Sequence, residues 1–549
     1  MRIAWALVVV GCSSSPSQMA MPDAPPAGCQ DGVAGTQHGL SIDVSGEQRF
    51  YWLHVPASVH CTAPAPLLVD FHGTAGGDAP EEAYQTHALI AFADAHGVIV
   101  ARPRSRSSLF NGAPIYRWDE NAGDLDKNRA FAKQLVGALE QQYTIDPARV
   151  YASGFSSGSN MTAQFLIDPS SPFKGIAPIA GGRWTTDALP ALANGPRIYM
   201  STGYRDYLWP TARDLIDQVT AAGLPADALT VRHTGGGHDL YAWHFDELWQ
   251  WLDGRRGFGD GAIAAPWTTE TLPSPADINA LAFDGTTLVA AGAHGRTWRH
   301  GVSGWTLDLD RGTADYTALC FGASVGAVGG DYTVVPRAGS AWGADMMIPD
   351  YGQQLGAGWA NAAACRDDGT LAVVGYWSAA IRTGTTWSKL DPQTMFGFAG
   401  QMAGAAAAPG GATIVAGYYD YLGRAAHGSA TAAPVDHPLA PEWWNAVTEA
   451  GGHFWVVGDG GAMMTSADDG VTWAAQTSGT TENLYAVAFA DAQHGVAVGR
   501  RGTVIVTADG GATWTARPLG RDVYLGAAAI DATTITVAGE GGLVASSAR

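Results

Sequence analysis

The sequence is poor in charge, and in positive charge above all. Of its 549 residues, 31 are Lys or Arg and 51 are Asp or Glu, which gives a formal net charge of −20 at pH 7. Nucleic acids and anionic membrane surfaces attract basic patches, so this balance argues against both as partners. It leaves the fold open.

Cysteine is scarce as well, with five copies in the chain. None of them has the spacing of a zinc site, and no His, Asp or Glu cluster suggests a catalytic metal, so we expect neither a metal nor a cofactor. In an exported protein, Cys29 and Cys61 are candidates for a disulfide at the start of the first domain. Cys320 and Cys365 occupy the same position in two successive repeats and either pair or stay free.

Long hydrophobic runs are missing beyond the N-terminus, so no segment is expected to span a bilayer. Residues 1–12 have one positive charge, a short apolar run and a small residue before a break, which is typical of an export signal. The alternative is a buried first strand or a misplaced start codon. The stretch Val9-Val10-Gly11-Cys12 resembles the bacterial lipoprotein box, which implies cleavage before Cys12 and lipid on its thiol.

We therefore expect an exported protein that is either lipid-anchored to a bacterial membrane, in the periplasm or at the cell surface, or secreted. Residues 13–28, rich in Ser, Pro and Ala, would be a flexible tether. A chain of 549 residues is too long for one ordinary core. Residues 29–257 are interpreted as the first domain, 258–264 as a linker and 265–549 as the second domain.

Apolar strand candidates alternate with helical stretches in the first domain. This alternation predicts an α/β domain with a mostly parallel sheet and helices on both faces, and chemistry at the carboxyl ends of the strands. The strand candidates are residues 51–55, 67–71, 98–101, 150–153 and 198–202.

One of these strands runs into Gly154-Phe155-Ser156-Ser157-Gly158, and a helix is expected from Ser159 onward. A serine at the apex of such a turn has its hydroxyl forced out of the fold, and the glycines leave room for the close approach of the helix. The pattern predicts a nucleophilic serine at Ser156. A second Gly-x-Ser-x-Gly, centred on Ser324, lies between strand-like runs with no helix after it, and we interpret it as coincidence.

Further polar residues follow other predicted strands. Asp206 follows residues 198–202, and His238 lies in a glycine-rich loop before an amphipathic helix. The order Ser156, Asp206, His238 is that of a hydrolase triad, with His238 as the base and Asp206 as its orienting acid. Backbone N–H groups of Ser157 and Thr74 would stabilise the oxyanion.

Each assignment has competitors. Asp239 and Asp246 compete for the acid, while His233 and His244 compete for the base. His72, beside Thr74, is expected next to the pocket, where it orients its loop.

Several stretches together resemble the bacterial feruloyl esterase/poly(3-hydroxybutyrate) depolymerase family over roughly residues 29–255. They are Tyr143-x-Ile-Asp-Pro-x-Arg-Val-Tyr, Gly154-Phe-Ser-x-Gly-x-x-Met161, His72-Gly73, Gly203-x-x-Asp206 and Gly237-His238. The resemblance implies an α/β-hydrolase that acts on carboxylic esters outside the cytoplasm, with Ser156, Asp206 and His238 as triad and Thr74 at the second oxyanion position.

By the same resemblance Trp118 would lie near the pocket, although a tryptophan in a surface loop fits the sequence equally well. Ser159 stands where the family usually has Gly, and the residues after His238 also depart from the family pattern. These departures leave the acyl and alcohol preferences open.

The second domain repeats with a period of about 40 residues, the length of a four-stranded propeller blade. Units begin near Asn279, Thr317, Asn361, Ala403, Asn445, Tyr485 and Leu525. The last unit lacks its final strand, and residues 266–271 can supply it at the front of the domain. Closing the ring in this way predicts seven blades, with six or eight as alternatives.

Two turns in this domain, Ser466-x-Asp468-x-Gly470-x-Thr472-Trp473 and Thr507-x-Asp509-x-Gly511-x-Thr513-Trp514, resemble the Asp-boxes of sialidases, sortilin-like receptors and photosystem assembly-factor propellers. These boxes are structural, and the arginine cluster that a sialidase needs is not recognisable. The propeller is expected to bind substrate or a partner, or to serve as a scaffold.

The sequence thus predicts an exported serine esterase whose substrate is an ester on plant polysaccharide or a hydroxyalkanoate polyester. The rival interpretation is a surface binding protein in which the propeller is functional and the hydrolase half vestigial. An intact Ser, His, Asp and oxyanion loop favours the enzyme, because drift would usually remove one of them.

Overall fold

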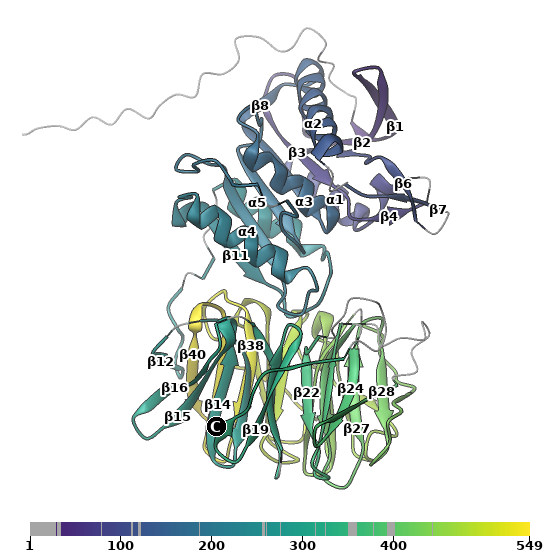
Figure 1. Cartoon of the computed structure of the whole chain (residues 1–549). Helices are drawn as coiled ribbons and strands as arrows, with labels where there is room; N and C mark the ends of the chain where they lie inside the picture. The colour runs from purple at the N-terminus through teal and green to yellow at the C-terminus, as the bar shows by residue number, and fades with distance from the viewer. Residues whose placement is uncertain are drawn as a thin grey trace, which may run out of the picture.

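A computed structural model shows two domains, an α/β domain followed by a β domain (Figure 1). The structure describes residue 29 and residues 34–549, apart from 78, 111–112, 119–121, 186, 255–257, 260, 275, 313, 324, 350–358, 377, 392–400 and 442. The predicted signal and tether (residues 1–28), the lipidation site at Cys12 and the second motif serine, Ser324, therefore lie outside the described residues.

The first domain is built on one eight-stranded sheet in the order β1-β2-β5-β3-β8-β9-β10-β11. Pairing is parallel from β5 to β11, and β1 and β2 add an antiparallel edge. The strands are β1 (Gly35–Val44), β2 (Glu47–Val55), β3 (Ala65–Phe71), β5 (Ile99–Pro103), β8 (Ile145–Phe155), β9 (Gly175–Ile179), β10 (Arg197–Thr202) and β11 (Leu229–His233). Strands β4 (Ala75–Gly76), β7 (Ala113–Tyr116) and β6 (Ser107–Phe110) form a separate small sheet.

Helices cover both faces of the large sheet because its central strands are apolar on both sides. In β3 every residue is buried, with Leu67 and Val69 in one core and Leu68 in the other. The first core packs against α2 (Ala122–Gln142), α3 (Ser157–Ala163) and α4 (Trp209–Ala221), and the second against α1 (Thr86–His96) and α5 (Trp243–Leu252). Short 3₁₀ turns complete the domain: η1 (Pro80–Glu82), η2 (Gln164–Ile167) and η3 (Ala226–Ala228). This layered arrangement confirms the predicted α/β class.

The second domain is a β-propeller of seven antiparallel sheets among the described residues. Its innermost strands touch in a closed ring that runs from β13 through β17, β22, β26, β30 and β34 to β38 and back to β13.

The first three sheets consist of β13 (Ile278–Asp284), β14 (Thr287–Gly292), β15 (Arg296–Gly301) and β16 (Gly304–Asp310); β17 (Tyr316–Phe321), β18 (Gly326–Gly330), β19 (Thr333–Ala338), β20 (Ala341–Trp342) and β21 (Met346–Met347); and β22 (Ala362–Cys365), β23 (Thr370–Gly375), β24 (Ser378–Thr383) and β25 (Thr386–Lys389). The next three consist of β26 (Met402–Ala407), β27 (Thr413–Gly417), β28 (Leu422–Ala425) and β29 (Ala433–Pro434); β30 (Trp444–Ala450), β31 (His453–Gly458), β32 (Met463–Ser466) and β33 (Ala474–Ala475); and β34 (Leu484–Phe489), β35 (Gly495–Gly499), β36 (Val504–Thr507) and β37 (Thr515–Ala516). The last sheet consists of β12 (Thr268–Glu270), β38 (Leu525–Ile530), β39 (Thr534–Gly539) and β40 (Val544–Ala548).

The last sheet combines the two ends of the domain. Strand β12 pairs antiparallel with β40, with Thr269 opposite Ala545. This pairing leaves no open edge where the ring would otherwise break. It confirms the predicted closure by strands from both termini, and with it the seven blades.

The predicted Asp-boxes are turns held by their aspartates. Oδ1 of Asp468 accepts hydrogen bonds from the backbone N–H of Thr472 (2.9 Å) and from the Ser466 hydroxyl (2.8 Å). Asp509 accepts the same pair of bonds from Thr513 and Thr507. Both boxes therefore stabilise turns between outer strands, which fits the structural role predicted for them.

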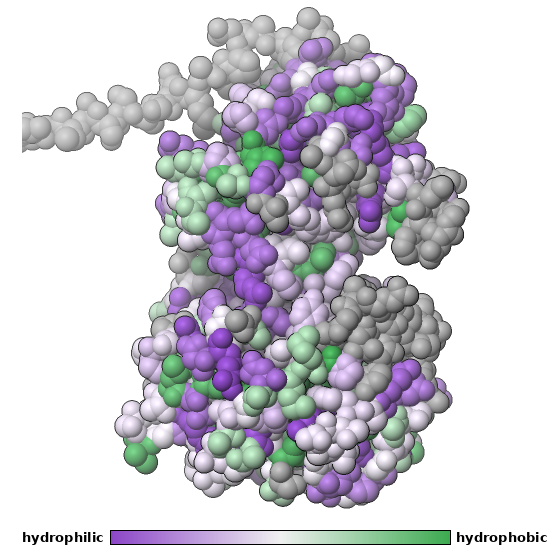
Figure 2. Space-filling model, in the orientation of Figure 1, coloured by the Kyte–Doolittle hydropathy of each residue, from purple (hydrophilic) through white to green (hydrophobic). Residues whose placement is uncertain are grey.

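Two disulfides lie within the described residues. Cys29 and Cys61, the pair suggested from the sequence, are joined at the start of the first domain. Cys320 of β17 and Cys365 of β22 are joined as well, and this bond links neighbouring blades. Among the helices of the described residues, none is long and apolar enough to cross a membrane. In the view of Figure 2, hydrophobic residues form small groups among hydrophilic ones.

The first domain sits on one face of the propeller, where the second strand of each blade ends (Figure 1). In four blades this end is followed by a short 3₁₀ turn: η4 (Ala293–Gly295), η5 (Asp459–Gly461), η6 (Arg500–Gly502) and η7 (Glu540–Gly542). Arg232 of β11 reaches this face and contacts Asp522 (2.8 Å) and Glu540 (3.1 Å). Further ion pairs between the domains are Arg213–Asp315, His233–Asp277 and Arg500–Glu247. Arg232, Arg213 and His233 of the first domain thus meet acidic side chains of the propeller, while Arg500 of the propeller meets Glu247 of the first domain.

The carboxyl group of Asp331, at this interface, makes the stability of the protein depend on pH. Burial, and then the neighbouring Asp315 carboxylate, raise the pKa of Asp331 to about 6. The unfolded value is about 3.9, so the stability associated with the protonated form is fully present below about pH 4 and is lost as the pH rises through about 6. We expect Asp331→Asn to raise the free energy of unfolding by about 1–3 kcal/mol at pH 8 and to change it little at pH 4.

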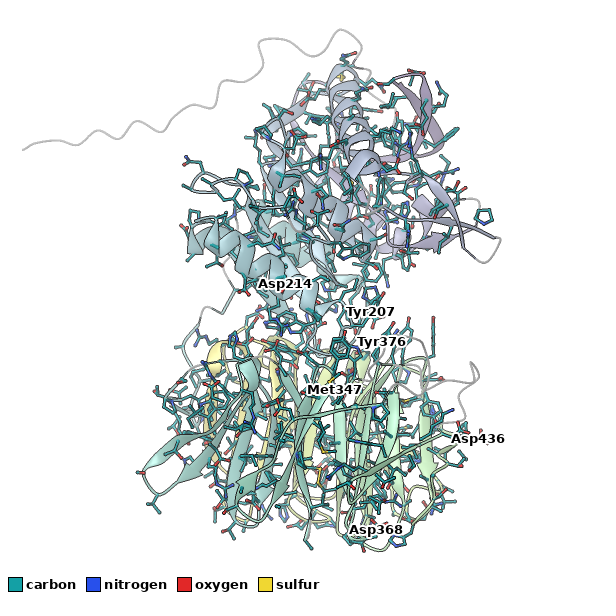
Figure 3. All side chains as sticks on the ribbon, in the orientation of Figure 1. Tyr207, Asp214, Met347, Asp368, Tyr376 and Asp436 are labelled. Carbon is teal, nitrogen blue, oxygen red and sulfur yellow. A yellow bond between two sulfur atoms is a disulfide. The ribbon has the colours of Figure 1, made fainter. Side chains whose placement is uncertain are left out.

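Urea unfolding at the two pH values measures this difference. Asp436→Asn is the matched control, because Asp436 is exposed on the rim of the propeller, away from the interface (Figure 3). An effect of Asp331→Asn that is the same at pH 4 and pH 8 would contradict the electrostatic explanation.

Candidate active site

Ser156 lies at a sharp turn between β8 and α3. Its backbone has φ 56° and ψ −116°, a conformation that few side-chain-bearing residues adopt. A Cβ atom on Gly154 would come within 2.3 Å of the Gly158 carbonyl oxygen, and a Cβ on Gly158 within 2.0 Å of the Phe71 carbonyl oxygen. Glycine is therefore required at both positions for the helix to start this close to β3 and β8. The turn has the strand–turn–helix form predicted from the sequence.

The structure brings together the three side chains predicted to act as a unit. Nε2 of His238 lies 2.8 Å from Oγ of Ser156. Nδ1 of His238 lies 3.0 Å and 3.1 Å from the two carboxylate oxygens of Asp206. With a proton on Nδ1, the ring donates to Asp206 and accepts the serine hydroxyl, which is the arrangement that makes a serine nucleophilic.

Asp206 is completely buried at the carboxyl end of β10. Besides His238, its carboxylate accepts a hydrogen bond from the backbone N–H of Leu208 (2.8 Å). His238 lies in the loop between β11 and α5, and its side chain is 12% exposed. The acid is thus fixed and shielded, while the imidazole retains contact with the surface.

The loop after β3 carries Thr74 toward Ser156, and both residues line the same cavity. Tyr84 donates a hydrogen bond to the Thr74 carbonyl oxygen and so helps to set the orientation of this peptide. The oxyanion role of the backbone N–H groups of Thr74 and Ser157 stays a prediction.

His72 and Trp118 support this loop from beneath. Both are 0% exposed and neither lines the cavity at Ser156, which differs from the pocket position suggested from the sequence. His72 Nδ1 donates to the Gly73 carbonyl oxygen (2.5 Å) and Nε2 accepts the Ser105 N–H (3.1 Å). Burial lowers the pKa of His72 to about 4, so the ring is neutral. The Trp118 indole N–H donates to the His72 carbonyl oxygen (2.9 Å).

The cavity at Ser156 has a volume of about 490 Å³, and its walls are partly polar and partly apolar. It is lined by Thr74, Arg117, Ser156, Arg183, Trp184, Thr185, Tyr207, Leu208, Thr211, Asp214 and Gln218. Its size falls within the range of small-molecule sites.

The competing residues have partners elsewhere. His244 is buried with Nε2 2.8 Å from the Ser201 hydroxyl, and burial lowers its pKa to about 3. His233 pairs with Asp277 of the propeller (2.9 Å). Asp246 contacts His96 at the surface (2.9 Å). Asp239 is buried in the loop after His238, and the carboxylate next to the His238 ring is that of Asp206.

Tyr207, which follows Asp206, was not among the predicted site residues. Its ring centroid is 4.6 Å from that of His238, and it lines the cavity. Burial, and then the Asp206 carboxylate, raise the pKa of Tyr207 above its ordinary range, while a hydrogen bond with Ser156 acts in the opposite direction. Its position directly after the predicted acid was the signal available in the sequence.

The two domains of the chain are similar to different known proteins. The DUF6242 beta propeller domain family matches residues 376–524. Poly(3-hydroxyalkanoate) depolymerase C of Paucimonas lemoignei is 35% identical over 132 residues, which are 24% of this chain and 30% of that protein. The bifunctional acetylxylan esterase/xylanase XynS20E of Neocallimastix patriciarum is 29% identical over 129 residues, 24% of this chain and 18% of that protein.

Among solved structures, YCF48 from Cyanidioschyzon merolae is 16% identical, with a TM-score of 0.41, and the match covers 52% of this chain and 98% of that one. The chain spans 30% and 18% of the lengths of the two curated relatives. Its first domain is an α/β domain with homology to esterases and polyhydroxyalkanoate depolymerases. Its second domain is a β-propeller, as its seven sheets and the match to the DUF6242 propeller family show.

Proposed function

We propose that the protein is a serine carboxylic-ester hydrolase in which Ser156 is the nucleophile, His238 the general base and Asp206 the residue that orients the imidazole. The observation that carries the proposal is the unbroken chain of short contacts from Ser156 through His238 to Asp206 at the edge of a cavity. Homology of the first domain to esterases supports the reaction class.

In this mechanism His238 Nε2 accepts the proton of Ser156 Oγ as that oxygen attacks the carbonyl carbon of the ester. The positive charge on the imidazole is stabilised by the Asp206 carboxylate beside Nδ1. The tetrahedral oxyanion accepts hydrogen bonds from the N–H groups of Ser157 and Thr74. Each such donor is typically worth about 10²- to 10³-fold in rate.

His238 then gives its proton to the leaving alcohol, and an acyl group remains on Ser156. A water molecule, deprotonated by the same His238, attacks this acyl group and releases the acid. All atoms are accounted for by ester and water, so the cycle needs no cofactor.

The substrate class is an acyl ester of a polysaccharide or a polyester of hydroxy acids. The names of the relatives support both, since one is a depolymerase of poly(3-hydroxyalkanoate) and the other an acetylxylan esterase. Export is supported by the disulfides Cys29–Cys61 and Cys320–Cys365, since such bonds persist in oxidising compartments. Anchoring through lipid on Cys12 belongs to the same proposal.

A substrate panel tests the proposal and separates the two classes. Residues 29–549 are assayed on p-nitrophenyl acetate, methyl ferulate, acetylated xylan and oligomers of 3-hydroxybutyrate. We expect hydrolysis of p-nitrophenyl acetate, and a clear preference for one of the other three substrates: methyl ferulate, acetylated xylan or the 3-hydroxybutyrate oligomers. The rival function, a binding protein with a vestigial hydrolase half, predicts no turnover of any ester in the panel.

A further inference from the structure

The loop that carries His238 is built to lie against the propeller. It contains three consecutive glycines, Gly235, Gly236 and Gly237, and none of them has φ in the left-handed region. Backbone conformation therefore does not explain the glycines. Space does: a Cβ on Gly235 would lie 2.2 Å from the ring of Tyr485, and a Cβ on Gly237 would lie 2.5 Å from the ring of Trp443.

The two aromatic side chains belong to neighbouring blades of the propeller. Trp443 precedes β30, and Tyr485 lies in β34. They are 0% and 1% exposed, and the glycine loop of the first domain lies against both rings. Trp443 is also supported from within the propeller, where its ring packs against Tyr418 with centroids 4.7 Å apart. The His238 loop thus rests on a fixed aromatic surface.

The loop that carries Asp206 reaches the propeller too. The Tyr207 ring lies between His238 and Tyr376 of the propeller, 4.6 Å and 4.5 Å from them between ring centroids. In Figure 3 the side chains of Tyr207 and Tyr376 meet at the junction of the domains. Arg205 connects both loops with the propeller, because its Nη1 donates to the carbonyl oxygens of Gly235 (3.1 Å) and Asn445 (2.7 Å).

The two loops also depend on each other. A Cβ on Gly203, at the start of the Asp206 loop, would lie 2.3 Å from the Gly236 carbonyl oxygen. A shift of either loop would therefore move the other. Without the propeller, a segment with three successive glycines would have a wide choice of backbone conformations and little to select one of them.

We propose that the propeller is a positioning element of the hydrolase site: Trp443, Tyr485 and Tyr376 hold the loops of His238 and Asp206 in the geometry that Ser156 requires. This inference rests on the proposed esterase function. It assigns the covered face of the propeller to the protein's own hydrolase domain, so this face is not available to an external partner. The three aromatic residues are positioning residues, since they act through His238 and Tyr207.

The test is a double-mutant cycle on Gly237 and Trp443 in residues 29–549. Gly237→Ala forces the His238 loop away from Trp443, and we expect kcat for p-nitrophenyl acetate to fall about 100-fold with KM little changed, since a displacement of about 1 Å costs this much. Trp443→Ala removes the support, with a smaller loss. Because the double variant relieves the clash, we expect it to be as active as Trp443→Ala and more active than Gly237→Ala. The other close atom, Gln401 Oε1, is the end of a flexible side chain.

Trp444→Ala is the matched control. Trp444 is the next residue, is also 0% exposed, and packs inside the propeller against residues such as Phe454 and Leu422. We expect it to lower thermal stability without the kcat loss of Gly237→Ala. Hydrogen exchange of the peptide 234–240 gives a second measurement that does not need turnover: Trp443→Ala should increase its exchange and Trp444→Ala should not.

Losses in the Gly237 and Trp443 variants that simply add in the double variant would overturn the inference, as would unchanged exchange of residues 234–240 in Trp443→Ala. Different results would overturn the esterase proposal and the positioning role of the propeller. If the unmodified protein hydrolyses no ester and its Ser156 does not react with a fluorophosphonate probe, the esterase proposal fails, while the exchange experiment still decides whether the propeller holds the loop.

Discussion

Replacement of Ser156 by alanine is expected to lower kcat for p-nitrophenyl acetate by about 10⁴- to 10⁶-fold. Alanine removes the only atom that can form the acyl bond and leaves the rest of the site in place. The residual rate would come from the oxyanion N–H groups and from binding. Because the side chain is small and at the end of β8, the fold should be retained, as circular dichroism and the melting temperature would show.

Ser324→Ala is the matched control for this variant, because Ser324 is the centre of the second Gly-x-Ser-x-Gly in the chain. We expect it to keep full activity. Equal activity of Ser156→Ala and the unmodified protein would rule out Ser156 as nucleophile, and loss of activity in Ser324→Ala alone would move the site into the propeller.

Asp206→Asn is expected to have the next largest effect, a fall of about 10⁴-fold in kcat at pH 7. The carboxylate accepts bonds from His238 Nδ1 and from the Leu208 N–H, and an amide can keep the contacts in place while its NH₂ group favours the wrong tautomer of the imidazole. KM should change little, since Asp206 does not line the cavity. Steady-state kinetics of the purified variant measure both constants.

Asp246→Asn separates this effect from a general loss of negative charge. Asp246 was a competitor for the role of acid, and it lies at the surface in contact with His96. Its substitution should leave kcat unchanged. If Asp246→Asn and Asp206→Asn lowered kcat equally, the orienting role of Asp206 would be untenable.

The local parts of the site could be predicted from the sequence because each has its own pattern. The Ser156 turn is indicated by two glycines at fixed distances from the serine, and the structure shows the backbone approaches that require them. The propeller was predictable for a related reason: its strands repeat, so the missing last strand and its replacement by β12 could be inferred from the count of units.

The docking of the two domains could not be predicted in this way. Arg232 meets Asp522 and Glu540 across about half of the chain, and no period or spacing links these residues. The burial of Trp118 could not be predicted either, because the partner of its indole N–H is the His72 carbonyl oxygen, a backbone atom that no side-chain pattern reveals.

The three glycines at 235–237 are a feature of the sequence whose cause became clear only in the structure. Glycines can mark a turn, a left-handed conformation or a close approach, and sequence alone does not distinguish these. The φ angles exclude the left-handed conformation, and the short Cβ distances to Tyr485 and Trp443 show a close approach to another surface. That surface is formed by residues more than 200 positions later in the chain.

The most direct test of Ser156 as the nucleophile is to trap the acyl intermediate. Residues 29–549 are mixed with excess p-nitrophenyl acetate, quenched in acid within the pre-steady-state phase, digested and mapped by mass spectrometry. If Ser156 is the nucleophile, we expect a burst of p-nitrophenol of about one equivalent per chain and an acetyl group on the peptide that contains Ser156. Hydrolysis without any acetylated peptide, or with the acetyl group on another residue, would contradict this role of Ser156.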